Sequence, residues 1–244
     1  MVRKHQFYII LLLLGTQLVS NCHQKKPHKE QLVTNKTLLD SPQKVSTKKK
    51  QKTVIKRRNN TLNDTLNDQN AVPFLLNYGK NNPETIVLFE TRLGSIKIRL
   101  YRDTPLHRAN FIFLTKTGYF NTTCFHRIVP GFIIQGGNSD HPSTRKMRMQ
   151  YNFTLPAEMK SHHKHKYGAL AAAREWENNP QKQSSPFEFY MIQDKRGAYH
   201  LEGEHTVYGE IIEGFDTMNK IAKLETDKKE WPLKEVFIKA TVIQ

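Results

Sequence analysis

The sequence predicts a mainly β protein, a closed antiparallel β-barrel of about eight strands capped by two α-helices. Two observations lead to this fold class. Short segments that alternate apolar and polar residues recur through the last two-thirds of the 244-residue chain, as is typical of strands with one buried face. Only two stretches of that region repeat apolar residues at helical spacing. Many short strands with few helices favour a barrel.

The predicted domain begins with a β-hairpin. Its strands span residues 86–91 and 95–101, which are rich in β-branched residues, and Leu93-Gly94 supplies the turn. Further strands are expected at residues 124–128, 132–135, 168–172, 187–192, 206–211 and 235–243.

The two helices are expected at residues 105–117 and 215–224. The first starts at Thr104-Pro105, where a threonine caps the helix and a proline takes the first helical position. Its apolar stripe then continues at helical spacing, and Gly118 ends it.

The basic charge of the chain lies mainly at its N-terminal end. Of the formal net charge of +16, residues 1–82 carry 15 Lys and Arg against 4 acids, which is +11, and the remainder carries +5. The hydrophobic fraction of 37% is low for a single globular domain. We therefore predict three parts: a signal peptide at 1–22, a disordered basic tether at 23–70 and a globular domain at 71–244.

The first residues are typical of a secretory signal. Arg3 and Lys4 precede an apolar run at residues 7–14, which is too short to span a membrane comfortably. Cys22 follows this run as in a bacterial lipobox, where the cysteine is acylated, although Asn21 replaces the usual small residue. We expect an exported chain in the cell envelope, lipid-anchored to a periplasmic or outer membrane through Cys22. Plain secretion and an uncleaved anchor are the alternatives.

The tether contains basic runs at residues 48–50 and 56–58. The simplest interpretation is a solvated spacer, and the second is attraction to an anionic membrane surface. We exclude nucleic acid as a partner, because aromatic residues that could stack on bases are absent from these runs.

Two groups of residues invite a metal or redox interpretation. His162, His163 and His165 lie close together in sequence, but no cysteine or paired acid is near them, so we favour a solvated loop and expect no metal. The chain has two cysteines, which excludes a disulfide scaffold. Cys124 is expected to be a buried apolar residue and His126 a structural hydrogen-bonding residue.

Residues 124–137 read Cys-Phe-His-Arg-Ile-Val-Pro-Gly-Phe-Ile-Ile-Gln-Gly-Gly. This stretch resembles the central signature of the cyclophilins, the peptidyl-prolyl cis-trans isomerases, and looks closest to their bacterial branch. The resemblance extends from Thr85 to Ile243. It implies a monomeric barrel that acts on proline-containing polypeptides without a metal, a cofactor or a covalent intermediate.

The resemblance also assigns the site residue by residue. The family's catalytic positions fall on Arg127, Phe132, Gln135 and His205, and its substrate-binding positions on Ile133, Ala173, Tyr190, Leu201 and Glu188. In the family the alanine at the position of Ala173 hydrogen-bonds the substrate backbone, and the leucine and histidine close the proline pocket.

Three features depart from the family pattern. His200 stands where a tryptophan is common, so tight cyclosporin binding is not expected. Glu188 replaces a glutamine and adds a charge that favours basic substrates. The loop at residues 174–186 is longer than in compact members.

The function expected from the sequence is isomerisation of X-Pro bonds to assist the folding of exported proteins. The alternative is a proline-peptide binding module or chaperone with weak or no turnover. A third hypothesis is that the basic tether itself binds anionic polymers.

Overall fold

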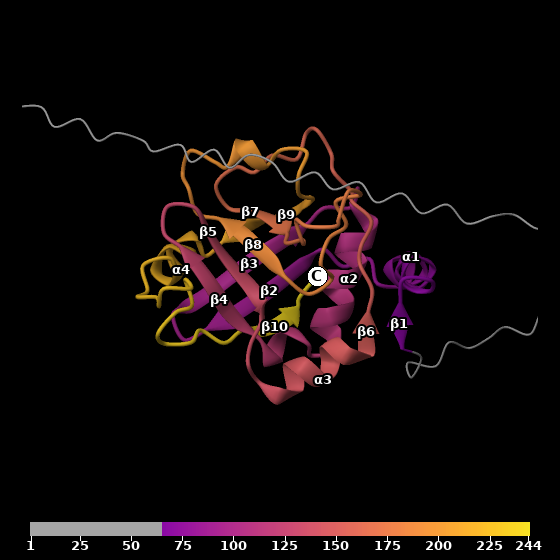
Figure 1. The fold of residues 1–244 in the computed structure, drawn as a ribbon, viewed down its shortest axis with the longest axis horizontal. Coiled ribbons are helices and arrows are strands. Elements are labelled where there is room, and N and C mark those ends of the chain that lie inside the picture. The colour runs from indigo at the N-terminus through magenta and orange to yellow at the C-terminus, as the bar shows by residue number, and fades with distance from the viewer. Residues whose placement is uncertain (1–64) are drawn as a thin grey trace, which may run out of the picture. The chain divides into compact units, whose positions relative to one another are not determined.

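The computed structural model describes residues 65–244. Its centre is one antiparallel sheet with the strand order β10-β2-β3-β9-β7-β8-β5-β4 (Figure 1). The strands are β2 (Ile86–Thr91), β3 (Gly94–Leu100), β4 (Cys124–Val129), β5 (Ile133–Asn138), β7 (Ala169–Ala172), β8 (Phe189–Ile192), β9 (Val207–Glu213) and β10 (Lys239–Val242). The mainly β class and the predicted strand positions are confirmed.

The barrel is not closed, and this part of the prediction is wrong. Among the described residues, no ladder joins the outer strands β4 and β10. The segment before β10 contacts β4 instead, through an isolated bridge between Cys124 and Phe237 and a few single backbone hydrogen bonds. The predicted last strand at 235–243 pairs regularly only from Lys239 onward. The chain before it follows the edge of β4 irregularly, because Pro232 has no N–H to donate and Glu230 has a φ of 66°. The result is a curled half-barrel.

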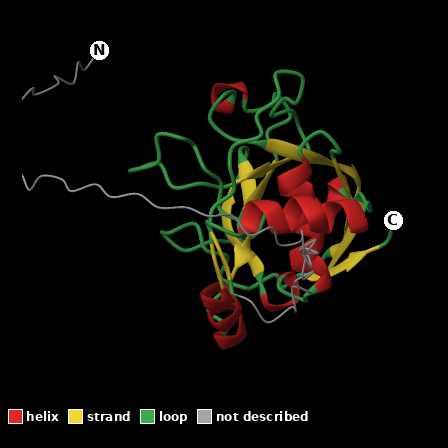
Figure 2. Cartoon of the chain, turned by 90° about the vertical axis from the view of Figure 1, so that its right-hand side faces the viewer, coloured by secondary structure: helices red, strands yellow, loops and turns green. Residues whose placement is uncertain are grey.

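The helix α2 (Pro105–Lys116) shares the main core with the sheet, and Figure 2 shows helices framed by the curled strands. α2 confirms the first predicted helix, and all residues from 106 to 115 are buried. Its cap differs from the prediction, because the Thr104 side chain makes no capping bond. Instead, the Glu158 carboxylate accepts hydrogen bonds from the backbone N–H groups of Leu106 and His107 at 3.1 and 2.9 Å. An acid distant in sequence thus satisfies the helix start.

The second predicted helix is present as α4 (Phe215–Ile221), and the described residues contain two more α-helices than expected. These are α1 (Ala71–Asn81) and α3 (Pro142–Gln150). α1 was not predicted because it contains Pro73 and Gly79, two residue types that disfavour a helix. Pro73 lies in the first turn, however, where a proline is tolerated. α3 is almost wholly polar and buries only Thr144, so it has no apolar stripe to read.

The folded part begins earlier than the predicted boundary at residue 71. β1 (Leu66–Asn67) pairs in parallel with β6 (Tyr151–Asn152), and Leu66 is buried in the core (Figure 1). These residues fall in the segment predicted as tether. The remainder of that segment, the predicted signal peptide and Cys22 lie outside the described residues.

The contact between α1 and α2 is very close. A Cβ at Gly79 would lie 2.9 Å from the Cβ of Ala109, so only glycine allows this approach. Arg108 of α2 donates to the carbonyls of Gly79 and Asn82 at 2.9 and 2.8 Å. α1 is therefore an integral part of the domain.

The sheet has apolar residues on both faces. Alternate strand residues such as Ile134, Leu170 and Met191 face the main core with α2. Their neighbours belong to a second, smaller cluster that includes Ile133, Ala171, Tyr190, Ile192, Ala198, Leu201 and Val207. This second cluster includes Leu201 of the short 3₁₀ helix Tyr199–Leu201. No helix among residues 65–244 is both long and apolar enough to cross a membrane.

Candidate active site

A pocket of about 530 Å³ opens on the second apolar face of the sheet. Its lining comprises Arg127, Phe132, Ile133, Gln135, Ala173, Arg174, Trp176, Tyr190, His200, Leu201 and His205. Every residue that the sequence assigned to catalysis is among them, and so are all the assigned substrate-binding residues except Glu188. The fold therefore brings together positions that lie up to 78 residues apart in the chain.

Strand register explains why the polar residues of the pocket form a row. Arg127 of β4 is paired with Gln135 of β5, and Gln135 is paired in turn with Tyr190 of β8. Residues paired in this way have their side chains on the same face of a sheet. The motif residues thus form one continuous strip across three strands.

Arg127 is oriented by two neighbours. Its Nε donates to the Glu230 carboxylate at 2.6 Å, and its Nη1 donates to the amide oxygen of Gln135 at 3.4 Å. Among residues 65–244, its Nη2 has no hydrogen-bond partner. The guanidinium is half-exposed, so it retains a donor for a ligand in the pocket.

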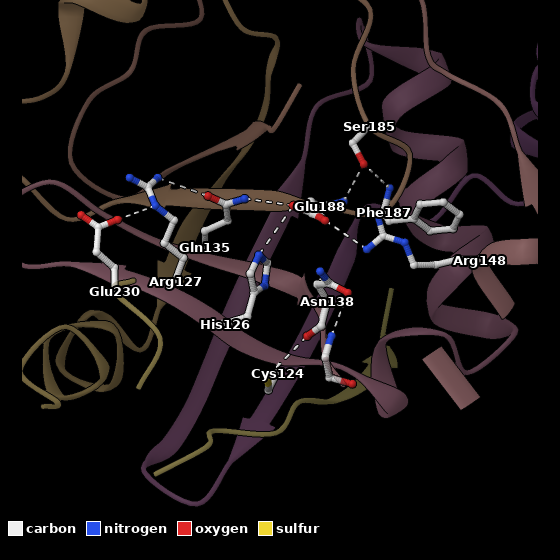
Figure 3. A network of polar contacts seen from close by, with 12 residues as sticks. Cys124, His126, Arg127, Gln135, Asn138, Arg148, Ser185, Phe187, Glu188 and Glu230 are labelled. Carbon is white, nitrogen blue, oxygen red and sulfur yellow. Dashed lines mark hydrogen bonds and ion pairs between the residues drawn. The ribbon is translucent and has the colours of Figure 1, made fainter. Parts of the chain in front are cut away.

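Glu188 continues this row beyond Gln135, between Gln135 and Arg148 (Figure 3), and it is not part of the pocket lining. Its carboxylate accepts from Nε2 of Gln135 at 3.0 Å and from Nη1 of Arg148 at 3.0 Å. Nε2 of His126 is 3.6 Å from the same carboxylate. Burial would raise the pKa of Glu188, but the contacts with His126 and Arg148 outweigh it and hold the pKa below its ordinary value. The carboxylate is therefore ionised and already compensated.

The apolar side chains of the pocket are fixed by burial and by contacts with neighbouring residues. Ile133, Tyr190 and Leu201 are buried, and Phe132 stacks on His200 with ring centroids 5.5 Å apart. The Tyr190 hydroxyl is 3.1 Å from Nε2 of His165, so its polar end has a partner. Burial raises the pKa of Tyr190, which keeps the ring neutral. These side chains form a continuous apolar surface in the pocket.

His205 presents an acceptor to the pocket. Its Nδ1 is 3.0 Å from the carbonyl oxygen of Ala172, and a carbonyl only accepts, so Nδ1 carries the proton. Burial lowers the pKa of His205 to about 4. The imidazole is therefore neutral at physiological pH, and its Nε2, which has no hydrogen-bond partner within residues 65–244, can accept a hydrogen bond.

The structure places Ala173 in the pocket, where both polar groups of its backbone already have a partner within the chain. Its N–H donates to the carbonyl of Glu188 at 3.0 Å, and its carbonyl accepts from Ser185 N–H at 2.8 Å. The N–H of Ala173 is thus used within the chain, while its carbonyl keeps a second lone pair, so the expected contact with a substrate backbone stays a prediction. The next residue, Arg174, has no main-chain hydrogen bond to any other part of residues 65–244, so it presents the free backbone edge.

Sequence reasoning did not assign Arg174 and Trp176 to the site. The Arg174 guanidinium is buried, pairs with Glu204 at 2.7 Å and lies 4.1 Å over the Trp176 ring. The exposed Trp176 ring meets His205 edge-on at 5.2 Å. A lone tryptophan within a charged loop is the sequence signal that could have indicated this wall of the pocket.

Two further expectations concern β4. Cys124 is buried, as predicted, and burial raises the pKa of its thiol to about 12. His126 is also buried, but its Nδ1 has no partner among the described residues and its contact with Glu188 is an ion-pair distance rather than a hydrogen bond. It is therefore a weaker structural link than expected.

Comparison with known proteins agrees with this geometry. The family model described as "Cyclophilin type peptidyl-prolyl cis-trans isomerase/CLD" matches residues 86–243. A peptidyl-prolyl cis-trans isomerase-like 3 of Dictyostelium discoideum is 31% identical and covers 64% of this chain and 94% of its own length. A bacterial peptidyl-prolyl cis-trans isomerase of Acinetobacter baylyi is 32% identical, with 58% and 74% covered.

Other relatives are much longer. The chain spans 29% of the length of a peptidyl-prolyl cis-trans isomerase-like 2 of Rhizopus delemar, which is 32% identical over 66% of this chain. A crystal structure of a Cryptosporidium parvum cyclophilin, determined in the presence of the dipeptide Ala-Pro, superposes with a TM-score of 0.56 and 26% identity. It covers 65% of this chain and 99% of its own.

The relatives are mostly eukaryotic, so the bacterial branch stays a prediction. The family model covers more than half of the chain and includes every pocket residue. The chain belongs to the cyclophilin-type peptidyl-prolyl cis-trans isomerase family.

Proposed function

We propose that the pocket catalyses cis/trans isomerisation of X-Pro peptide bonds. The observation that carries this proposal is the half-exposed guanidinium of Arg127, with a free Nη2, beside a dry apolar pocket. The pocket fits the proline ring, and the arginine then lies near the prolyl nitrogen. This is the arrangement that the reaction requires.

The barrier to isomerisation comes from amide resonance and is roughly 18–20 kcal/mol. Midway through the rotation the prolyl nitrogen is pyramidal and its lone pair is available. Arg127 donates a hydrogen bond to that lone pair, and the bond is much weaker in either planar ground state. Such a preference for the transition state over the ground state lowers the barrier.

Arg127 alone is insufficient. A charge-assisted hydrogen bond contributes roughly 1.5–3 kcal/mol, whereas a million-fold acceleration needs about 8 kcal/mol. The remainder comes from holding the peptide in a fixed geometry in a pocket without water. Phe132, Ile133, Tyr190 and Leu201 hold the ring, and Gln135 fixes the arginine.

The flanking peptide is expected to run along the free main-chain edge at Arg174. There the unpaired N–H and C=O can bond an extended peptide in the manner of an added strand. Nε2 of His205 accepts a hydrogen bond from the peptide on the same side. Trp176 covers this part of the groove.

A protease-coupled assay on a peptide containing Ala-Pro tests the proposal. The parent protein is expected to accelerate isomerisation, Arg127→Ala to lose most of the activity, and Arg127→Lys to recover only part of it because an ammonium lacks the rigid fork. Turnover at the uncatalysed rate in a folded parent, together with measurable peptide binding, would instead favour the binding module or chaperone.

For the biological setting, we propose a bacterial-branch member that acts as a monomer on exported proteins and is lipid-anchored through Cys22. The basic runs of the tether support attraction to an anionic membrane surface. Mass spectrometry of the mature protein tests the anchor, and an unmodified chain that begins beyond Cys22 contradicts it. Sedimentation with phosphatidylglycerol vesicles at low and high salt tests the membrane contact.

A further inference from the structure

Asp103, His162 and His163 form a cluster outside the pocket lining. One ligand atom from each residue lies within 4.8 Å of the other two. Asp103 precedes α2, and the two histidines belong to the loop between β6 and β7, so the fold brings together residues almost 60 positions apart. The paired acid that is missing from the sequence around the histidines is supplied in space by Asp103.

The three side chains converge through their metal-binding atoms. Nε2 of His162 is 2.9 Å from Oδ2 of Asp103, and Nε2 of His163 is 2.8 Å from Oδ1. The His163 ring stacks on Tyr101 with centroids 3.9 Å apart, which fixes its direction. The third histidine of the sequence cluster points elsewhere, since Nε2 of His165 contacts the Tyr190 hydroxyl at 3.1 Å.

We infer that Asp103, His162 and His163 form a binding site for a divalent transition-metal ion, with Zn²⁺ as the best fit. Two imidazoles and one carboxylate are a common zinc ligand set, and the open position accepts water. Mg²⁺ and Ca²⁺ prefer sets made of oxygen ligands and do not fit this one.

The geometry needs only a small adjustment. Ligand atoms around a tetrahedral zinc ion lie about 3.4 Å apart, given bonds of roughly 2.0–2.2 Å. The contacts of 2.8 and 2.9 Å must therefore lengthen by about 0.5 Å. Asp103 and His162 are exposed, so their side chains can move apart by this amount without disturbing the core. Two of the nearby lysines are paired with other acids, Lys164 with Glu202 and Lys166 with Glu210, so part of the local positive charge is already compensated.

The ion would fasten the loop that carries His162 and His163 to the segment that starts α2. Two residues further along this loop, His165 supports Tyr190 in the pocket. Binding to the folded state alone raises the unfolding temperature as the concentration of the ion rises. Metal binding at this site does not depend on the proposed isomerase activity.

Calorimetric titration of the metal-free full-length protein with ZnCl₂ tests the inference. The chain has three more histidines before residue 65, at positions 5, 23 and 28, so the result is the difference between variants. His162→Gln and Asp103→Asn are each expected to lose one zinc-binding event and the zinc-dependent rise in unfolding temperature. His141→Gln, which changes another exposed histidine, is expected to keep both.

Two further measurements sharpen the test. Co²⁺ is expected to give visible absorption bands in the parent that are lost in His162→Gln, and MgCl₂ at the same concentration is expected to leave the unfolding temperature unchanged. His162→Gln and Asp103→Asn variants that are folded by circular dichroism, yet bind as many ions as the parent with the same affinity, would overturn the inference.

Discussion

Glu230 accepts a hydrogen bond from Nε of Arg127 at 2.6 Å, although the two residues are 103 positions apart. The contact crosses the outer edge of β4, where the backbone N–H of Ile128 also donates to the Glu230 carbonyl at 2.9 Å. One residue of the C-terminal segment therefore fixes both the strand and the guanidinium that it carries. Arg127 is held from both sides, by Glu230 and by Gln135.

Replacing Glu230 with alanine is expected to weaken catalysis moderately. The pair is half-exposed, so its orienting effect is worth about 0.2–1 kcal/mol, which is roughly a 1.5- to 5-fold fall in kcat/KM. Glu230→Gln keeps an acceptor oxygen and is expected to lose less. The protease-coupled assay checks both variants, and an increase in activity would show that the pair restrains Arg127 instead of positioning it.

A glycine at position 230 distinguishes the effect of the lost carboxylate on activity from the effect of backbone strain on stability. Glu230 has a φ of 66°, which glycine adopts without strain. Glu230→Gly is therefore expected to lower kcat/KM like alanine, while its unfolding temperature is higher than that of Glu230→Ala.

Glu188→Gln is expected to destabilise the fold more than it alters activity. The change leaves Arg148 without its anion, at a cost of about 1–2 kcal/mol in the free energy of unfolding, but keeps an acceptor for Gln135. Urea unfolding measures the loss, with the exposed Glu175→Gln as the control. Because contacts lower the pKa of Glu188, its contribution is present above pH 4.5 and is lost as the pH falls further.

The preference for basic substrates that the sequence suggested at Glu188 is expected to be weak. Its charge is paired with Arg148, and the residue is not part of the pocket lining. Ratios of kcat/KM for peptides with lysine or glutamate before the X-Pro bond measure this preference. A ratio that changes several-fold in Glu188→Gln would contradict the expectation.

Because of His205, the protein is expected to become less stable as the pH falls below 6.5. The pKa of this histidine is about 4 in the folded protein and near 6.5 when exposed, so the unfolded chain binds the proton more readily. Stability is full above pH 6.5 and falls by up to about 1.4 kcal/mol per pH unit toward pH 4. Denaturant unfolding between these values measures the slope.

His205→Gln is the matched variant for this slope and is expected to reduce it. Burial also lowers the pKa of His165, so that histidine contributes a slope of its own, which His165→Gln isolates. Unchanged slopes in both variants would contradict the assignment. Activity is expected to persist to about pH 5, because His205 stays neutral until the pH approaches 4.

Trp176 is expected to contribute to peptide binding more than to turnover. It lines the groove and packs edge-on against His205, so Trp176→Ala is expected to raise KM and to change kcat little. The chain has two tryptophans, and a Trp231→Phe background isolates the fluorescence of Trp176. Titration with a proline peptide is expected to change that signal, and an unchanged signal at saturating peptide would remove Trp176 from the groove.

The sequence was sufficient for most of the sheet and of the pocket because both rest on local patterns. Alternation marked β2, β3 and β9, and the motif around Arg127 placed the main pocket residues. It was insufficient where long-range contacts replace local signals. Glu158 caps α2 from across the fold, and Asp103 reaches the histidines only in space. α3 has almost no buried face by which a helix could be recognised.

The half-open barrel has a consequence for the free edge of β4. An exposed strand edge can pair with another chain, and natural proteins protect such edges with a covering segment. Here the residues from Glu230 to Phe237 are that cover, through bonds such as Phe125 N–H to the Val236 carbonyl at 3.0 Å. Loss of this segment would leave the edge of β4 open to pairing with another chain, and it would also remove the Glu230 carboxylate that orients Arg127. Aggregation and inactivation are therefore linked through the same few residues.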